Sequence, residues 1–508
     1  MKHRRILSGL AALMLAASLP MSALAREWDI ADGDITIVAD NDGQKVSQGT
    51  ENDISDDNPV IIGNSATNTV SIVAEKDRTA SVTLSGANID GSTKGNAAVS
   101  TTGEGNVSIE LDGDNTLKSG KGHAGLEKKN GGKLTIADED KNGKLTAEGG
   151  KYGAGIGGGD QGAGSGITIT GGEIKATGGQ YGAGIGGGKG AGSDITISGG
   201  EVNATGGTSG AGIGGGYNGN GSDITITDGE VNATGGKYGA GIGGGEYGIG
   251  KDIIITGGEV NATGGRFSAG IGGGSRGTGS DITISGGEVN ASGGVNGAGI
   301  GGGLRSKGKD ITVSGDTKLK VQGGDEDHYD GAGAGIGDGG SNAYGTKILG
   351  AEVEPDTSGL TTGRIEYYAP GADMDKDAPS QTIVGTYIPP QPAREAAAPA
   401  QPAAPLYRVT DGDGKDVSYE TTWRDGVLTV TVEADRAVLT GRLSGIASLQ
   451  AQGIERIVFI TKGATSEFLT ADLLAAAPAT ERYALTHDGE TVTFTAGEAD
   501  VSGILVKA

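Results

Sequence analysis

The sequence contains no cysteine, and this absence excludes several kinds of site and of cross-link at once. Its 508 residues also include only 12 prolines and 4% aromatic residues. A chain without cysteine has no disulfide bonds, no thiolate metal ligands and no cysteine nucleophile. The scarcity of proline, and glycines that do not fall at every third position, exclude a collagen triple helix.

Positive charge is also scarce. There are 40 Lys and Arg residues against 64 Asp and Glu residues, which gives a formal charge of −24. Nucleic acids and anionic membranes attract basic residues, so we expect no nucleic-acid partner. After residue 25 no apolar run approaches the roughly 20 residues of a spanning helix, so we expect no membrane insertion. The four histidines show no metal-ligand or catalytic-triad spacing, and we predict that the protein is not an enzyme.

The first 25 residues have the three parts of a secretory signal peptide. Lys2, Arg4 and Arg5 form the basic segment, residues 6–19 form an apolar run, and Ala23 and Ala25 flank Leu24 at the predicted cleavage site. We therefore expect a secreted, extracellular protein that begins at Arg26. The end of the sequence carries no sorting motif, so any attachment to the cell surface is expected to be non-covalent.

Glycine, by contrast, is abundant and periodic. Among the 104 glycines, the segment AGIGGG recurs at intervals of 29, 28, 29, 29 and 29 residues, and the degenerate copy AGIGDG follows after 36. A fixed period of this size predicts a solenoid, in which each repeat packs on its neighbours. The isoleucines of these segments are Ile156, Ile185, Ile213, Ile242, Ile271, Ile300 and Ile336.

Each repeat predicts three short strands. In the unit from Ser193 to Gly216, residues 195–197 and 202–205 alternate between apolar and polar side chains, and Ala211 to Ile213 forms a third short segment. Glycine pairs between them permit tight turns. Strands that stack on their counterparts one period away describe an all-β fold, the parallel β-helix, with about 29 residues per coil.

The pattern also predicts where the parts of the chain begin and end. We expect irregular coils and a cap at 26–150, regular repeats at 151–340 and a second cap at 341–387. A linker rich in proline and alanine at 388–405 separates these from residues 406–508, which read as a small α+β domain. Within that domain, 443–452 and 466–477 are the expected helices.

One position in the repeat is enriched in aromatic residues. Four residues before the isoleucine of AGIGGG, four of six repeats carry an aromatic side chain, although the chain as a whole is only 4% aromatic. Aromatic rings serve both as packing and as platforms for sugars, and both interpretations remain open. The four residues are Tyr152, Tyr181, Tyr238 and Phe267, and Ser209 and Asn296 take their place in the other two repeats.

Polar residues form rows at the same period. We list the asparagine row, Asn203, Asn232, Asn261 and Asn290, as a candidate for hydrogen bonding to sugar hydroxyls; solvated surface is the alternative for every row. No cofactor is expected, although Ca²⁺ binding is possible at the acidic segments 138–143 and 325–330. The sequence leaves the metal unknown.

The repeat resembles the Gly-rich β-helical surface proteins of anaerobic Gram-positive bacteria. The resemblance is carried by DITISGGEVNATGG followed by GAGIGGG, and by LDGDNTL and HAGLEKKNGGKLTI further upstream, over residues from about 82 to 340. It implies a right-handed parallel β-helix, and many such proteins are described as carbohydrate-binding.

These observations leave three functional hypotheses. The first is a non-catalytic protein that binds an extracellular polysaccharide or surface glycan along the repeats, with other surface proteins as possible partners. The second is a structural stalk or adhesin rod that displays residues 406–508. The third is a β-helical polysaccharide lyase or hydrolase, whose unique catalytic site would lie in residues 26–150 or at 325–330.

Overall fold

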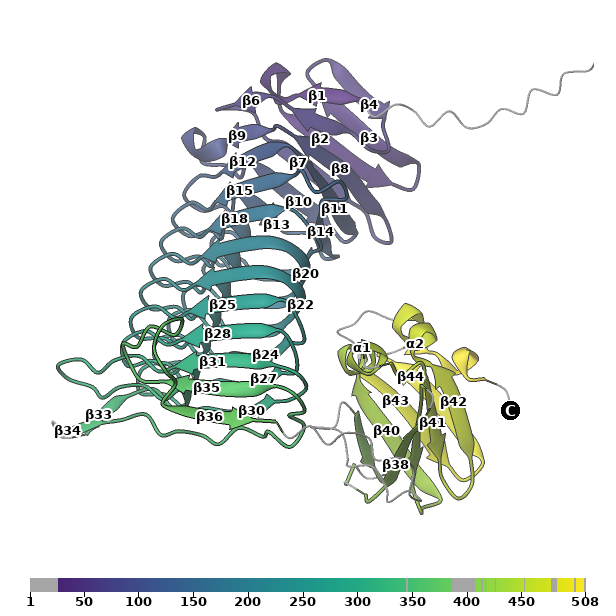
Figure 1. Cartoon of the computed structure of the whole chain (residues 1–508). Helices are drawn as coiled ribbons and strands as arrows, with labels where there is room; N and C mark the ends of the chain where they lie inside the picture. Colours follow the sequence, from purple (N-terminus) through teal and green to yellow (C-terminus); the bar gives the residue numbers. More distant parts are fainter. Residues whose placement is uncertain are drawn as a thin grey trace, which may run out of the picture.

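The computed structural model describes residues 26–343, 346–385 and 407–506, except 413, 416, 425, 452, 477–481 and 498. The predicted signal peptide and the predicted linker lie outside the described residues. Residues 26–385 form a parallel β-helix, as predicted, built from a 21-stranded and a 13-stranded sheet (Figure 1). In the described part of the chain, no helix combines the length and the apolarity needed to cross a membrane.

Each regular coil contributes strands to both sheets in a fixed order. The first row comprises β11 (Asn106–Asp112), β14 (Leu134–Ala137), β17 (Gly164–Ile169), β20 (Gly192–Thr205), β22 (Gly221–Thr234), β24 (Gly250–Ile255), β27 (Gly279–Ile284) and β30 (Gly308–Val313). The second row comprises β12 (Asp114–Lys118), β15 (Lys144–Glu148), β18 (Glu173–Thr177), β25 (Glu259–Thr263), β28 (Glu288–Ser292) and β31 (Lys318–Gln322). The third comprises β13 (Leu126–Lys128), β16 (Ile156–Gly157), β19 (Ile185–Gly186), β21 (Ile213–Gly214), β23 (Ile242–Gly243), β26 (Ile271–Gly272), β29 (Ile300–Gly301) and β32 (Ile336–Gly337).

The strands differ in length from the prediction. In β20 and β22 the first and second strands are continuous, with a register shift in place of the expected turn. The third strand is shorter than expected, because only the isoleucine and the glycine after it pair with the next coil. The register nevertheless keeps each residue beside its counterpart one repeat away, as in the pair Ile213 and Ile242.

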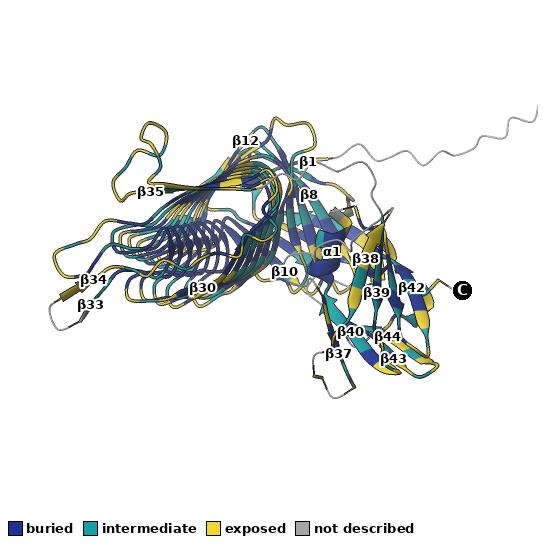
Figure 2. Cartoon of the chain, turned by 60° about the horizontal axis from the view of Figure 1, so that its bottom comes forward, coloured by how far each residue is buried: buried dark blue, intermediate teal, exposed yellow. Residues whose placement is uncertain are grey.

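The core consists of rows of identical side chains. In one coil Ile195, Ile197, Val202, Ala204 and Ile213 are all at most 1% exposed. Their counterparts in neighbouring coils continue one cluster along the whole β-helix, and Figure 2 shows buried positions that recur from coil to coil. The interior is narrow, so few apolar residues per coil are enough to fill it.

The glycines allow consecutive coils to approach each other. A Cβ atom on Gly236 would lie 1.5 Å from the carbonyl oxygen of Gly207 in the preceding coil. The same kind of contact recurs at Gly207 and Gly265. At these positions a side chain would collide with backbone, which cannot rotate away.

Both ends of the β-helix are closed by antiparallel strands. At the N-terminal end, β1 (Glu27–Asp29), β5 (Val60–Ile62), β6 (Asn64–Ser65), β7 (Val70–Ala74), β8 (Thr79–Ser85), β9 (Asn88–Asp90) and β10 (Val99–Gly103) form the first coils. Beside them, β2 (Ile35–Asp40), β3 (Gly43–Gln48) and β4 (Glu51–Ser55) pair antiparallel. At the other end, β36 (Gln381–Val384) pairs antiparallel with β35 (Arg364–Tyr368), while β33 (Ser341–Ala343) and β34 (Thr346–Ile348) form a hairpin. Such ends protect a solenoid from further strand pairing.

The residues after the linker have a hydrophobic core of their own. One sheet contains β37 (Tyr407–Thr410), β40 (Arg436–Arg442), β43 (Arg482–Asp488), β44 (Thr491–Ala496) and β45 (Ala499–Asp500). A second contains β38 (Glu420–Arg424), β39 (Val427–Thr431), β41 (Arg456–Ile460) and β42 (Thr465–Leu469). The helices are α1 (Leu443–Ala451) and α2 (Thr470–Ala476). The predicted helix at 466–477 is therefore wrong over its first four residues, which alternate in burial and pair with β41.

We expect Gly236→Ala to destabilise the β-helix by about 1–3 kcal/mol, the usual cost of overpacking. The control is Gly122→Ala, because a Cβ atom there would meet nothing closer than 3.8 Å. Urea unfolding followed by circular dichroism measures both variants. Equal stability of the two variants would contradict the role assigned to close coil-to-coil contact.

The second domain is expected to lose stability in mild acid. Burial lowers the pKa of His487 to about 4, and its Nε2 lies 2.8 Å from Ser466 Oγ. The unfolded chain takes up a proton near pH 6.5, so the stabilising effect is complete above that pH and is lost as the pH falls toward 4. The loss is on the order of 3 kcal/mol.

Hydrogen exchange in peptides from 407–506, corrected for intrinsic exchange rates, measures this loss between pH 7 and pH 4.5. His487→Gln keeps an uncharged hydrogen-bonding side chain and is expected to flatten the dependence. A slope that survives in this variant would assign the effect to other groups.

Candidate functional site

A tight turn in each coil brings two loops to the same edge of the β-helix. In the segment AGIGGG, the amide of Ala211 donates to the carbonyl of Gly215 at 2.9 Å, and the same bond recurs in the five other copies of the segment. We call the residues before this segment the first loop (206–210 in this coil) and those after it the second loop (217–220). The amide of Tyr217 donates to the carbonyl of Tyr181 at 2.8 Å, so the two loops are in direct contact. Together they form the loop edge, whose first loops follow β15 and β18 in Figure 1.

The four predicted aromatic residues lie in first loops and form two stacked pairs. The ring centroids of Tyr152 and Tyr181 are 5.3 Å apart, and those of Tyr238 and Phe267 are 5.8 Å apart, each pair with an interplanar angle of 11°. These distances exceed the roughly 3.5–4.0 Å of carbon contact, so the rings are displaced and each covers only part of the next. Ser209 interrupts the row, and its buried hydroxyl donates to Glu246 Oε2 at 2.7 Å.

The structure adds two aromatic residues that the sequence analysis did not select. Tyr217 meets Tyr181 edge-on at 5.6 Å, and Tyr247 meets Tyr217 edge-on at 6.1 Å. Both residues lie in second loops, within two positions after the GGG of their repeat. Their position after GGG is the feature of the sequence that could have identified them. Only the tight turn, however, shows that the second loops lie on the same edge as the first loops. Tyr247 is 46% exposed.

Basic side chains lie over these rings. The ammonium groups of Lys151, Lys121 and Lys189 are 5.3, 5.7 and 5.9 Å from the ring centroid of Tyr152. Further along the edge, the cation–ring pairs are Lys237 with Tyr238 at 4.8 Å, Arg266 with Phe267 at 5.0 Å and Arg276 with Tyr247 at 5.9 Å. Three of these pairs are adjacent in sequence, as Lys-Tyr or Arg-Phe directly before GAGIGGG or SAGIGGG.

The second loops also hold bulky residues in a conformation that favours glycine. Tyr247, Arg276 and Arg305 have φ values of 63°, 62° and 59°. Left-handed backbone is unfavourable for such residues by roughly 1–2 kcal/mol, and strained positions cluster at functional sites. Glycine would be more stable at these three positions. The repeat is rich in glycine, yet it has a tyrosine or an arginine there.

The insertion at 325–330 closes the C-terminal end of the loop edge. Asn296, the last residue of the predicted aromatic row, is fully buried and donates to the carbonyls of Asp330 and Gly331. The carboxylate of Asp330 accepts two hydrogen bonds from Arg305, at 2.9 and 3.0 Å. Asp327 accepts the backbone amides of Tyr329 and Asp330. These two carboxylates therefore hold the insertion together.

The other acidic segment proposed for Ca²⁺ is similarly occupied. The carboxylate of Asp138 accepts the backbone amides of Asn142 and Gly143, at 3.2 and 3.1 Å, and Asn142 donates to Asp140. Within the described ranges, no three His, Asp or Glu side chains gather in an arrangement suited to a metal ion. Ca²⁺ binding remains a prediction from the sequence.

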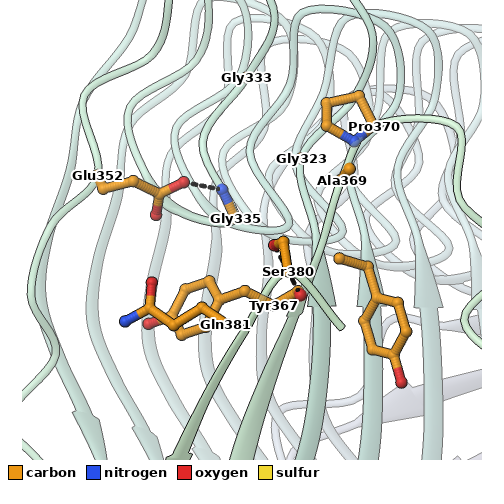
Figure 3. Close-up of a pocket in the computed structure, with 10 residues that line it drawn as sticks. Gly323, Gly333, Gly335, Glu352, Tyr367, Ala369, Pro370, Ser380 and Gln381 are labelled. Carbon is orange, nitrogen blue, oxygen red and sulfur yellow. Dashed lines mark hydrogen bonds between the residues drawn. The ribbon is translucent and has the colours of Figure 1, made fainter. Parts of the chain in front are cut away.

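A separate pocket lies where the C-terminal cap covers the last coil. It is lined by residues that include Gly335, Glu352, Tyr367 and Gln381 (Figure 3). The Glu352 carboxylate accepts hydrogen bonds from the backbone amides of Gly335 and Ile336, at 2.7 and 3.1 Å. It therefore supplies partners for two backbone N–H groups at the end of the β-helix. Burial, with the charges of Glu352 and Glu354, raises the pKa of Tyr367 to about 12. This pocket has a structural role in the cap, and we place the candidate site at the loop edge.

The predicted asparagine row lies elsewhere, on β20, β22, β25 and β28. The amide group of each asparagine donates to the side-chain oxygen of the one before it, at 3.1 Å from Asn232 to Asn203, 2.9 Å from Asn261 to Asn232 and 2.8 Å from Asn290 to Asn261. These side chains are half-buried and bind one another. The structure thus does not bring the asparagine row together with the aromatic row.

We expect Asn232→Ala to destabilise the β-helix by about 1–2 kcal/mol, because it leaves the side chains of Asn203 and Asn261 without their partner. The matched control is Thr234→Ala, two residues away on the same strand and exposed. Thermal unfolding compares the two variants with the native chain. If both variants unfold at the native temperature, the ladder does not stabilise the fold.

Comparisons with known proteins agree with this architecture. A family model described as a beta helix repeat matches six segments, at residues 141–160, 167–189, 195–217, 224–246, 253–275 and 282–304. No curated protein and no solved structure matches the chain. The matched segments contain five of the six aromatic residues of the loop edge, all but Tyr247, and the chain is similar to β-helix repeat proteins over these coils.

Proposed function

We propose that this protein is exported and binds an extracellular polysaccharide, without catalysis, along the loop edge of its β-helix. The observation that carries the proposal is the gathering of six aromatic rings on one edge of a chain with so few aromatic residues. Aromatic rings bind the apolar faces of sugars, and the hydroxyl groups of the five tyrosines can hydrogen-bond to sugar hydroxyls. The predicted signal peptide supports export.

The repetition favours a polymer over a small molecule. Successive coils lie about 4.8 Å apart, the spacing of paired strands, and they present similar groups at each step. The rings follow one another at centroid distances of 5.3 to 6.1 Å from Tyr152 through Tyr181 and Tyr217 to Tyr247. An extended chain of sugars has repeating units that contact such a row together, which increases the total affinity.

The same repetition supports a non-catalytic role. Catalysis needs a unique constellation of groups at one point, whereas the loop edge offers similar groups over many coils. At the insertion, where a unique site was conceivable, Asp327 and Asp330 hold local structure. The buried pair of Ser466 and His487 belongs to the core of the second domain. A β-helix repeat alone does not distinguish enzymes from binding proteins.

Affinity electrophoresis of the full mature chain through gels containing pectin, xylan, mannan, cellulose derivatives or mucin tests the proposal. We expect at least one polymer to retard the native chain. The triple variant Tyr152, Tyr181 and Tyr238→Ala is expected to lose about tenfold or more in affinity, since each lost stacking contact costs on the order of 1 kcal/mol.

The matched control replaces three exposed residues on the strands, Thr205, Thr234 and Thr263, with alanine. It is expected to migrate as the native chain does. Free migration of the native chain through every gel would contradict the proposal and favour the structural stalk. Equal loss in both triple variants would contradict the assignment to the loop edge.

A further inference from the structure

We infer that the polysaccharide bound at the loop edge is anionic, a polymer that carries carboxylate or sulfate groups along its length. This inference rests on the proposed function and specifies its ligand. Its basis is a reversal of charge: the chain as a whole is strongly acidic, but the loops of the loop edge that precede the insertion at 325–330 are basic.

The loops and the strands of the same coils differ in sign. The first loops from 119–123 to 293–297 and the second loops from 160–163 to 304–307 contain only two carboxylates, Asp160 and Glu246. Their eight basic residues are Lys121, Lys151, Lys189, Lys237, Arg266, Arg276, Arg305 and Lys307. The acidic residues stand on the strands, in two rows: Asp194, Asp223, Asp252, Asp281 and Asp310, and Glu173, Glu201, Glu230, Glu259 and Glu288.

In the part of the chain that the structure describes, most of these basic groups have no carboxylate as an ion-pair partner. Arg305 is paired with Asp330. Among the residues that the structure describes, the six cations that lie over rings of the loop edge form no ion pair, although many lysines on the strands do, such as Lys144 with Glu173. The three ammonium groups around Tyr152 repel one another, and an anion placed among them would relieve that repulsion.

The arrangement of cations and rings suits one acidic sugar after another. A ring contacts the apolar face of a sugar, and the cation beside it pairs with the carboxylate or sulfate on the edge of that sugar. Lys151 lies within 5.8 Å of the rings of both Tyr152 and Tyr181, so it can serve two adjacent coils. A neutral polysaccharide would use the rings but leave the cations without counter-charges.

The test compares polymers that share a backbone and differ in charge. Polygalacturonate is compared with its methyl ester, and carboxymethyl cellulose with hydroxyethyl cellulose, by affinity electrophoresis of the full mature chain. We expect at least tenfold tighter binding to the charged member of at least one pair. This preference is expected to weaken from about 0.01 M to about 0.1 M salt, as the screening length falls from about 30 Å to about 10 Å.

Two triple variants with the same change in net charge separate the loop edge from the strands. The edge triple replaces Lys151, Lys189 and Lys237 with glutamine, and the strand triple replaces Lys175, Lys309 and Lys318. The edge triple is expected to lose about tenfold in affinity for the charged polymer, and the strand triple less than twofold. Circular dichroism verifies that both variants are folded.

The outcomes distinguish this inference from the proposed function. Equal binding to both members of each pair, or equal loss in the two triple variants, would overturn the anionic ligand while a polysaccharide-binding protein remained. A native chain that binds no polysaccharide in either panel would overturn the proposed function itself.

Discussion

Coil-to-coil backbone pairing sets the spacing on which every other feature of this β-helix depends. Each residue lies beside its counterpart one repeat away, as Ile213 does beside Ile242. Glycines such as Gly236 make this approach possible, because any side chain there would collide with the neighbouring backbone. Once the spacing is fixed, a side chain that recurs at the repeat period becomes a row, buried or exposed according to the direction of its Cα–Cβ bond.

The tight turn at AGIGGG places the recurring side chains of two loops on one surface. The bond from Ala211 to Gly215 holds the two flanking loops at one edge, so residues eight positions apart, such as Ser209 and Tyr217, belong to the same face of the molecule. Aromatic and basic side chains occupy that edge, whereas the acidic rows follow the strands. The β-helix therefore separates its charges by structural element, and the net charge of the whole chain does not describe the charge of its loops.

The asparagine and aromatic rows show that the same sequence signal can have different physical meanings. Both recur at the repeat period, and the sequence makes both candidate sugar contacts. The asparagine amides are short, point the same way and match the coil spacing, so they hydrogen-bond to one another. The aromatic rings instead form nearly parallel, displaced pairs and remain half exposed at the edge. The chemistry of the side chain accounts for the difference, because an amide can donate to the next amide in its row and a ring face can only stack.

The sequence by itself determined the repeat, the parallel β-helix, its buried isoleucine and valine rows and the aromatic position, because a solenoid depends mainly on contacts one period apart. It did not determine that Tyr217 and Tyr247 join the aromatic row, nor that Lys121, Lys151 and Lys189 converge on Tyr152. The contacts of Tyr217 with Tyr181 and of Lys189 with Tyr152 join a second loop to the first loop of a neighbouring coil, and the others join loops of the same kind or lie within one loop. Strand β42 replaces the start of a predicted helix for a similar reason. Its pairing with β41 outweighs the local preference of these residues for a helix. Only the tertiary structure decides such contacts, because they depend on where the turns place the chain and no period in the sequence encodes them.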